Sequence, residues 1–334
     1  MVYIYKKTIN GKPYYYLRIS KIVKGKTVVK DIAYLGSEAS EVEQKLNKLS
    51  GYKDAIRKAY RNIKKFIQSE HYLKKAEALK LKSNPYISQG LLEEVEAAKL
   101  HFNEHFQKLN EKTREETYKN FLIDFAFNTT SIEGNTITLN EASRLLKENL
   151  TPKNRTLREI HDLKNTEKVF FQILDLKEKI SHESVIRMHD QLLENIDARK
   201  GYRAHDVRVL GSRFEPSPAV YIKTDMDILF KWLDKNEEKL HPLALAGLFH
   251  QKFERIHPFA DGNGRTGRML VNYMLLRKGY PPIIVRKSRR ADYLNALAQG
   301  NKLDLNETRP EYFKDLTEYL AEEMVHGYWN SFLT

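Results

Sequence analysis

The first 36 residues alternate apolar and polar side chains as β-strands do. Val, Ile, Tyr and Thr lie on both sides of Asn10-Gly11, a residue pair typical of a tight hairpin turn. A third strand-like run, TVVKDIAYLG, follows Lys24-Gly25-Lys26. The pattern therefore predicts a small three-stranded antiparallel sheet over residues 2–36, which needs a helix against one face to be stable.

From Glu41 onward the apolar residues recur at helical spacing instead. The first helical run extends from Ile56 to Leu73, and Ser83-Asn84-Pro85 breaks it. Further amphipathic stretches predict helices within residues 91–109, 114–127, 151–174, 183–195, 224–238, 242–255 and 312–326. The predicted fold class is therefore mainly α, preceded by a small antiparallel β-sheet at the N-terminus.

One segment of the helical part has strand character. VRVLGSRFEPSPAVYI, residues 207–222, alternates around Gly211-Ser212 and is interrupted by Pro216-Ser217-Pro218. It predicts a β-hairpin flap. Since a lone hairpin on a helical domain is seldom needed for packing, the flap indicates a functional role.

The positive charge is concentrated at one end of the chain. The net charge is +13, and residues 1–84 alone hold 20 basic and 7 acidic residues, while residues 85–334 hold 37 of each sign. This asymmetry indicates two functional units, of which the first faces a polyanion. The expected division is a basic β-rich module over 1–50, a helical linker region over 51–112 and a helical domain over 113–334.

The residue types present limit the chemistry. The chain has no cysteine, which excludes disulfides, thiol nucleophiles and thiolate metal sites, so any metal must bind to oxygen or imidazole. No run of eighteen apolar residues is present, and the start, MVYIYKKTINGK, lacks the apolar segment of an export signal. The expectation is a cytoplasmic protein without a membrane partner.

Residues 257–268, HPFADGNGRTGR, form a polar stretch between two predicted helices. Pro258 prevents simple continuation of the first helix, and the second is expected to begin after Arg265. The free N–H groups at a helix start favour an anion, and Gly262 and Gly264 let backbone amides approach phosphate oxygens. This position allows three interpretations: a metal site, a phosphate cradle or a merely polar turn.

The charged residues of the stretch favour a phosphate ligand. Arg265 and Arg268 lie three residues apart on the first helical turn and can contact the same anion. A lone carboxylate such as Asp261 suits Mg²⁺, which keeps waters and shares substrate phosphates. A neutral His257 beside a held phosphate can accept the proton of a hydroxyl. A capped turn with surface arginines explains each residue singly but not the whole set.

The stretch HPFADGNGRTGR resembles the signature of Fic-domain enzymes, His-x-Phe-x-Asp/Glu-Gly-Asn-Gly-Arg-x-x-Arg. The resemblance implies a helical Fic fold and transfer of AMP from ATP to a hydroxyl of a target protein. It implies that His257 is the base and that Asp261 holds Mg²⁺ (or Mn²⁺) on the phosphates. The further roles it implies are an anion hole of Gly262, Asn263 and Gly264, and contacts of Arg265 and Arg268 with the β- and γ-phosphates.

Two further segments agree with this resemblance, which covers about residues 114–330. GYRAHDVRVLGSRFEPSP is similar to the family's flap, which pairs with an extended segment of the target by β-augmentation. RADYLNALAQGN is similar to the segment that closes the adenine pocket, which implies Tyr293 and Asn301 as nucleotide-binding residues.

Residues 129–135, TTSIEGN, resemble the family's inhibitory motif with Thr129, Glu133 and Gly134. Alternatively, they are a helix end at Gly134, followed by a cap at Thr138 or Asn140. The resemblance implies an inhibitory helix of about residues 120–134. Its Glu133 would pair bidentately with Arg268 and occupy the place of the γ-phosphate. This arrangement is typical of the class whose inhibitory helix precedes the core, and a homodimer is plausible by resemblance.

Other functions remain open at this stage. In some family members the same glutamate helps water remove AMP, and the loop could also accept another phosphate-containing donor. A nucleic-acid-binding role is a different alternative: its candidate residues are Tyr14, Tyr15, Tyr16, Lys6, Lys7, Arg18, Lys21 and Lys24. A solvated lysine-rich sheet, or one that docks a target protein, explains the same residues.

Overall fold

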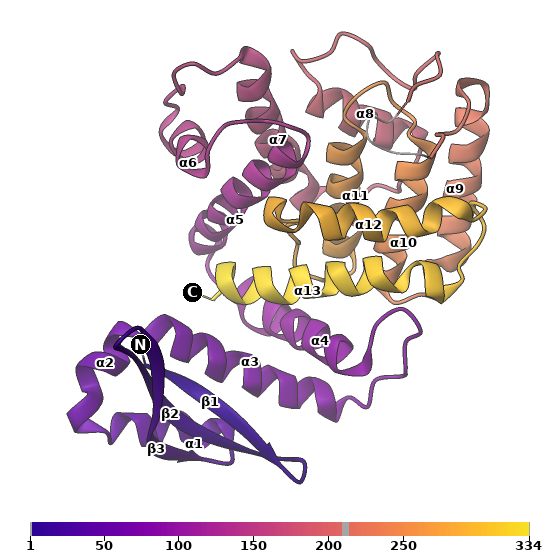
Figure 1. Ribbon diagram of the computed structural model, residues 1–334. Helices are drawn as coiled ribbons and strands as arrows, with labels where there is room; N and C mark the ends of the chain where they lie inside the picture. The colour runs from indigo at the N-terminus through magenta and orange to yellow at the C-terminus, as the bar shows by residue number, and fades with distance from the viewer. Residues whose placement is uncertain (1, 209–213, 334) are drawn as a thin grey trace.

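The computed structural model describes residues 2–208 and 214–333. The small sheet and its helices form one end of the molecule, and the larger helical body forms the rest (Figure 1). Within the described residues no helix is long and apolar enough to cross a membrane.

The predicted N-terminal sheet is confirmed. Its strands β1 (Val2–Ile9), β2 (Lys12–Val23) and β3 (Lys26–Gly36) pair antiparallel in the order β1-β2-β3. Asn10 and Gly11 have positive φ values of 50° and 76°, as the two-residue turn requires.

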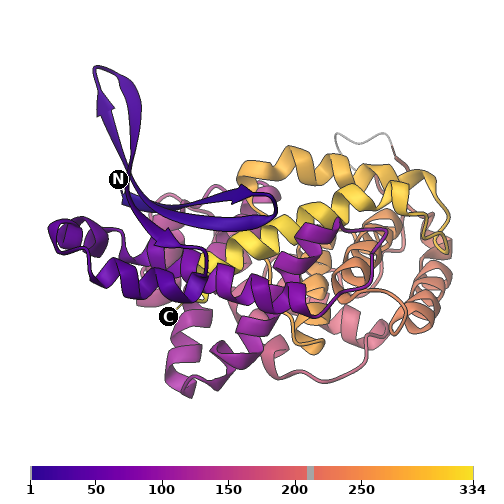
Figure 2. The same ribbon diagram turned by 90° about the horizontal axis from the view of Figure 1, so that it is seen from below.

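Three helices follow the sheet: α1 (Ala39–Asn47), α2 (Lys53–Lys58) and α3 (Tyr60–Ala78), with a 3₁₀ turn at Ser50–Tyr52. The sheet's buried residues pack with Val42 and Leu46 of α1 and Ile63 of α3. These helices therefore supply the cover that the sheet needs on one face. The β2–β3 ribbon extends beyond this cover and projects away from the helices (Figure 2).

The larger body is helical, as predicted. Its α-helices are α4 (Gln89–Glu104), α5 (Glu111–Ile132), α6 (Leu139–Glu148), α7 (Leu157–Asp175), α8 (His182–Leu192), α9 (Ile222–Asn236), α10 (Pro242–Ile256), α11 (Asn263–Arg277), α12 (Arg290–Gln299) and α13 (Lys314–Ser331). Single 3₁₀ turns lie at Phe106–Lys108, Ala219–Tyr221, Lys287–Arg289, Gly300–Lys302 and Pro310–Tyr312.

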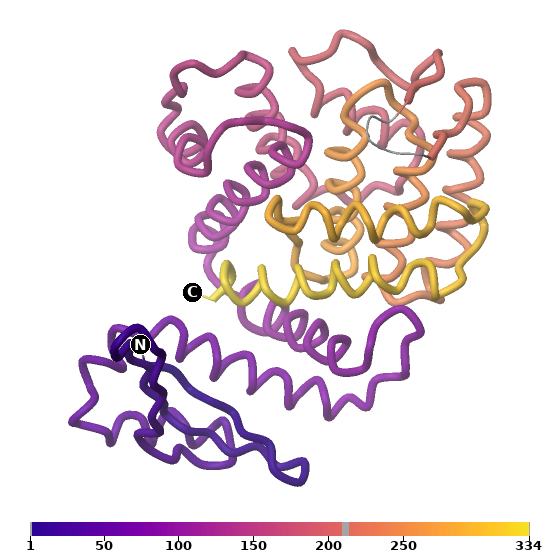
Figure 3. The backbone as a smooth tube through the Cα atoms, in the orientation of Figure 1, coloured from indigo at the N-terminus to yellow at the C-terminus, as the bar shows by residue number. Residues whose placement is uncertain are grey.

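Helices α3, α4 and α13 contact one another between the sheet and the rest of the body (Figure 3). Helix α3 also packs on the sheet, whereas α4 contributes Leu92, Val95 and Phe102 to the main core. The predicted helical linker over 51–112 thus contains helices from two hydrophobic clusters. The division into 1–50, 51–112 and 113–334 stays a prediction.

Helix α5 is held by apolar contacts on two sides. Phe121 and Phe125 pack against Phe170 of α7, and Phe121 also contacts Phe332 after α13. A separate cluster joins Ile123 and other α5 residues to α6 and α7. Thr138 caps α6 in a capping box with Glu141, which confirms one of the two predicted caps.

Helices α10 and α11 enclose the HPFADGNGRTGR stretch. Helix α10 ends at Ile256, and His257 follows in the left-handed conformation (φ 52°). Helix α11 begins at Asn263 after Gly262 (φ 77°), earlier than the predicted start after Arg265. Gly262 adopts this φ without a Cβ penalty, so the chain turns into the helix at once, and Gly264 and Arg265 lie in its first turn.

The predicted hairpin over 207–222 has no strand in its described residues. Residues 209–213, which include the turn at Gly211-Ser212, lie outside the described residues. The C-terminal part was wrongly predicted as a strand: Ala219–Tyr221 form a 3₁₀ turn that leads into α9. Tyr221 donates to the Pro218 carbonyl within the turn, and the Ala219 N–H donates to the side chain of Asp206 at 2.7 Å.

Candidate active site

His257 sits at the end of α10 with a partly exposed imidazole. Its side chain is 21% exposed, and its backbone N–H donates to the Phe253 carbonyl at 2.9 Å. Burial lowers the pKa of His257 below its ordinary value. The ring is therefore neutral at neutral pH, the state that a proton acceptor needs.

Glu254, one turn before His257, is the nearest carboxyl group to its ring. Oε2 of Glu254 lies 4.0 Å from Nδ1 of His257. Burial raises the pKa of Glu254 to about 8, so the carboxyl is largely protonated at neutral pH. His257 consequently has no ionised partner on its own helix.

The predicted anion cradle, residues 262–264, lies at the start of α11. A Cβ at Gly262 would lie 2.4 Å from Leu193, and one at Gly264 would lie 2.2 Å from Oε1 of Glu133. Leu193 therefore fills the space in front of Gly262, and the Glu133 carboxylate fills the space in front of Gly264. The side chain of Asn263 does not face this space: it bonds to both the N–H and the carbonyl of Phe259, which fixes the loop.

Arg268 and the predicted inhibitory residues lie together. Nη2 of Arg268 donates to Oε1 of Glu133 at 2.7 Å, and its Nε donates to the Thr129 hydroxyl at 2.8 Å. The expected bidentate pair is wrong, because one carboxylate oxygen alone contacts the guanidinium and Nη2 also donates to the Thr129 carbonyl. Arg268 is 4% exposed and Glu133 is 39% exposed at the side chain.

The C-terminal carbonyls of α5 explain why an arginine binds there. The last carbonyls of a helix lack partners within it and carry a partial negative charge. Arg268 donates a hydrogen bond to the Thr129 carbonyl at 2.9 Å, and Arg290 donates one to the Ile132 carbonyl at 3.1 Å. The end of α5 is therefore held in the site by two cations as well as by Glu133, while Gly134 (φ 101°) turns the chain away.

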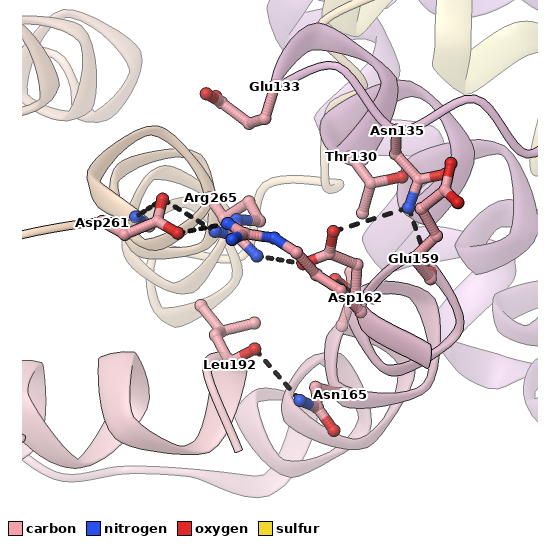
Figure 4. A network of polar contacts seen from close by, with 12 residues as sticks. Thr130, Glu133, Asn135, Glu159, Asp162, Asn165, Leu192, Asp261 and Arg265 are labelled. Carbon is pink, nitrogen blue, oxygen red and sulfur yellow. Dashed lines mark hydrogen bonds and ion pairs between the residues drawn. The ribbon is translucent and has the colours of Figure 1, made fainter. Parts of the chain in front are cut away.

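Arg265 lies between two carboxylates rather than facing open space (Figure 4). It pairs with Asp162 of α7 and, at 3.2 Å, with Asp261. Asp261 also pairs with Arg158 of α7 and accepts from the Gly262 N–H at 2.6 Å. Burial opposes ionisation of Asp261, yet Arg265 and Arg158 hold its pKa below the usual value.

Asp162 connects this ion-pair group to the loop after α5. The side chain of Asn135 donates to the Glu159 carbonyl at 3.0 Å and lies 3.5 Å from Asp162 (Figure 4). The loop after α5 is therefore linked through α7 to Arg265 and Asp261.

The two predicted adenine-pocket residues are placed differently from one another. Tyr293 is 1% exposed, and its hydroxyl lies 2.6 Å from Nε2 of His250. Its ring centre lies 6.0 Å from the Arg268 guanidinium, so Tyr293 borders the site from within. Asn301 is partly exposed and accepts from Gln251 at 3.0 Å. The nucleotide-binding role of both residues stays a prediction.

Arg203 joins the base of the flap to the active-site loop. Its Nε donates to the His257 carbonyl at 2.9 Å, and its Nη1 and Nη2 donate to the carbonyls of His205 and Ser217 at 2.9 and 2.5 Å. Arg203 is 6% exposed. This buried arginine therefore fixes the chain at His205 and at Ser217 relative to His257.

Several of these residues did not emerge from the sequence: Arg158, Asp162, His189, Arg203 and Glu254. His189 stacks on Phe259 at 3.7 Å, and its Nε2 lies 3.0 Å from the Asp261 carbonyl. Its only signal was a polar residue on the apolar face of α8, beside Val185, Met188 and Leu192. A satisfied core histidine gives the same signal.

The donor set fits a metal that is shared with a ligand. Within residues 2–208 and 214–333, three or more His, Asp or Glu side chains do not gather into a metal cage. Asp261 is a single carboxylate at the anion cradle, and Mg²⁺ binds through one or two carboxylates together with phosphate oxygens. Asp261 is thus the residue of this site that would hold such an ion.

Comparison with known proteins agrees with this geometry. Residues 179–275 match the Fic/DOC family. A protein adenylyltransferase, fic-1 of Caenorhabditis elegans, is 30% identical over 238 residues, which cover 68% of this chain and 46% of the relative. The Fic adenylyltransferase of Drosophila ananassae is 32% identical over 204 residues, which cover 58% of this chain and 39% of that protein. The chain thus spans about half or less of these relatives' length.

Solved structures agree on the fold. A Fic-domain-containing signalling protein from Bacteroides thetaiotaomicron superposes with a TM-score of 0.63 at 25% identity, over 70% of this chain and 94% of that one. Fic-1 of C. elegans (residues 134–508) superposes with a TM-score of 0.58 at 23% identity, over 88% and 81%. The matched residues 179–275 include His257, residues 262–264 and Arg268, and this part of the chain is therefore a Fic domain.

Proposed function

We propose that the chain is an autoinhibited protein adenylyltransferase, which transfers AMP from ATP to a hydroxyl side chain of a target protein and to itself. The observation that carries the proposal is the pairing of a neutral, partly exposed His257 with an anion cradle at the start of α11. Curated relatives named protein adenylyltransferases support the activity.

In the proposed reaction His257 takes the proton of the target hydroxyl. The hydroxyl oxygen forms a bond to the α-phosphorus, the bond from that phosphorus to the bridging oxygen breaks, and pyrophosphate leaves. The N–H groups at Gly262 and Gly264 would hold phosphate oxygens, and Asp261 would hold Mg²⁺, which supplies charge neutralisation when bound.

The inhibition follows from the place of Glu133. Its Oε1 lies 2.7 Å from Arg268 and 2.2 Å from where a Cβ on Gly264 would be. A phosphate bound to the cradle and to Arg268 needs the same space and the same partner. Transfer would therefore require displacement of Glu133, as expected of the class whose inhibitory helix, here α5, precedes the core.

Removal of AMP from a target is the second function that a specific observation favours. Oε2 of Glu133 forms no hydrogen bond or ion pair within the described residues, and the side chain is 39% exposed. This oxygen could orient a water and accept its proton while Oε1 stays on Arg268.

Incubation with ATP labelled at the α-phosphate and Mg²⁺ tests the proposal. Wild type, Glu133→Gly and Glu133→Gly/His257→Ala are compared for labelling of themselves and of a cell extract. We expect strong labelling by Glu133→Gly alone. No labelling by Glu133→Gly with ATP, although it labels with another labelled nucleotide, would assign a different donor. Release of AMP from a labelled target by wild type but not by Glu133→Gly would establish the reverse reaction.

A further inference from the structure

The solvent-facing side of the N-terminal sheet carries a cluster of tyrosines. In the strand register Tyr3 pairs with Arg18, Tyr5 with Tyr16, and Tyr16 with Tyr34. Paired residues of antiparallel strands point to the same side of the sheet. We call this side the tyrosine face; its tyrosines are Tyr3, Tyr5, Tyr14, Tyr16 and Tyr34.

The opposite side of the sheet is the buried one, and this corrects the candidate set from the sequence. Tyr15 is fully buried and donates to Glu70 at 2.9 Å, and Lys6 pairs with Glu70 at 2.8 Å. These two residues therefore hold the sheet on α3 and do not belong to the tyrosine face. Lys7 and Arg18, in contrast, belong to the tyrosine face.

The rings of the tyrosine face are grouped, with Tyr34 exposed and the other four partly exposed. Tyr34 is 49% exposed, and its ring centre lies 5.4 Å from that of Tyr16 and 6.4 Å from that of Tyr14. The Arg18 guanidinium lies 3.3 Å from the ring centre of Tyr5. Aromatic rings and guanidinium planes are the surfaces on which unpaired bases stack.

The charge around this face is suited to a polyanion. Residues 1–36 contain eight basic residues and one acidic residue, Asp31, which is already paired with Arg18. Six of the lysines are exposed and form no ion pair within the described part of the chain: Lys7, Lys12, Lys21, Lys24, Lys26 and Lys30. The last four lie in β2, in β3 and in the turn that joins them, so they belong to the projecting ribbon. Lysines without a partner in the protein can neutralise phosphates of a nucleic acid, and the counterions released from those phosphates favour binding.

We propose that the tyrosine face and the lysines of the β2–β3 ribbon bind single-stranded nucleic acid, with bases on the tyrosines and phosphates on the lysines. A single strand is favoured over a duplex because a base can stack on a side chain only when it is not already stacked between its neighbours in a duplex. A protein partner would have to supply a matching density of carboxylates. This site is separate from the Fic active site and does not depend on the proposed transfer of AMP.

The test is fluorescence anisotropy of a labelled oligonucleotide of about 12 nucleotides, within the site size of such surfaces. The full chain is titrated with single-stranded DNA, single-stranded RNA and the corresponding duplex. We expect saturable binding that prefers a single strand and weakens steeply as salt rises from about 50 to about 200 mM.

Paired variants separate stacking from charge. Tyr16→Ala/Tyr34→Ala should weaken binding about tenfold or more, whereas Tyr52→Ala/Tyr60→Ala, which removes two exposed tyrosines away from the tyrosine face, should not. Lys21→Ala/Lys26→Ala, on the exposed ribbon, should reduce the slope of log K against log salt concentration by about two. Lys80→Ala/Lys82→Ala, which lies outside the ribbon, should leave this slope unchanged.

Three results would overturn the proposal. They are no saturable binding at low salt, equal affinity for the duplex, and unchanged affinity in Tyr16→Ala/Tyr34→Ala. Thermal unfolding of each variant shows whether it is folded. If the tyrosine variant is unfolded, the lysine variants decide: a salt slope equal to wild type refutes the proposal.

Discussion

Replacement of Glu133 by Gln tests the electrostatic part of the proposed inhibition. The change keeps the size of the side chain and removes its charge, so that Arg268 loses its ionic partner but keeps both contacts with Thr129. An exposed ion pair contributes up to about 1 kcal/mol, and breaking a buried one costs about 3–5 kcal/mol. Because Arg268 is buried and Glu133 is 39% exposed, we take about 2 kcal/mol for this pair.

A difference of about 2 kcal/mol corresponds to about 30-fold in the equilibrium between blocked and open forms. We therefore expect Glu133→Gln to raise the rate of self-labelling with ATP by about 10- to 30-fold over wild type. Glu133→Gly, which also empties the space beside Gly264, should raise it at least as much. Glu148→Gln is the matched control, because Glu148 is exposed and forms no ion pair with the residues that the structure describes.

The two variants also separate charge from volume. If Glu133→Gly is activated but Glu133→Gln labels no faster than wild type, the magnitude derived from the ion pair is wrong and steric exclusion alone explains the inhibition. Without nucleotide both variants should have a lower melting temperature than wild type, because a buried arginine has lost its partner, and ATP should restore more of it in the variants than in wild type.

Four further predictions concern single residues. His257→Ala in the Glu133→Gly protein should abolish labelling without loss of ATP binding in calorimetry. Since burial lowers the pKa of His257, kcat/KM of the Glu133→Gly protein should stay level from about pH 8 down to about pH 6.5, and a fall of kcat/KM within this range would contradict the prediction. Arg158→Ala should lower the Mg²⁺ concentration for half-maximal labelling a few-fold, because Arg158 pairs with Asp261; an unchanged value would exclude this competition. Gly267→Ala should lower the free energy of unfolding in urea by about 1–3 kcal/mol, because its Cβ would lie 2.6 Å from His250 Nδ1, whereas Gly327→Ala, with open space around it, should be neutral or stabilising. His250, whose pKa burial lowers to about 3, stays neutral in the folded state while the unfolded state takes up a proton below about pH 6.5, so stability should fall by roughly 2 kcal/mol between pH 6.5 and 5, and His250→Gln should show a smaller loss.

The elements of the fold could be predicted where their signal is local. The strands alternate with period two, and the helices carry apolar stripes, so β1 to β3 and α10 to α11 follow from neighbouring residues. The same period could have separated Tyr15 from Tyr14 and Tyr16, since consecutive strand residues point to opposite faces. The predicted strand over 219–222 failed because a local 3₁₀ turn leads directly into α9.

The active site was predictable within HPFADGNGRTGR and less so beyond it. Arg158 and Asp162 lie 103 positions before their partners Asp261 and Arg265. Each is an ordinary charged residue of an amphipathic helix, so α7 gives no local sign that both are directed toward α11. Their ion pairs with Asp261 and Arg265 depend on how the helices pack, and residue spacing along the chain does not show this packing.

Gly264 has a consequence for how this protein can change. The Glu133 carboxylate fills the space that any larger residue at position 264 would need, and the proposed phosphate would fill the same space. A substitution at 264 therefore removes inhibitor and substrate together and leaves no active protein for selection to act on. If the proposed inhibition holds, active variants without it should arise from changes that release the end of α5, and we expect position 264 to stay glycine in permanently active relatives.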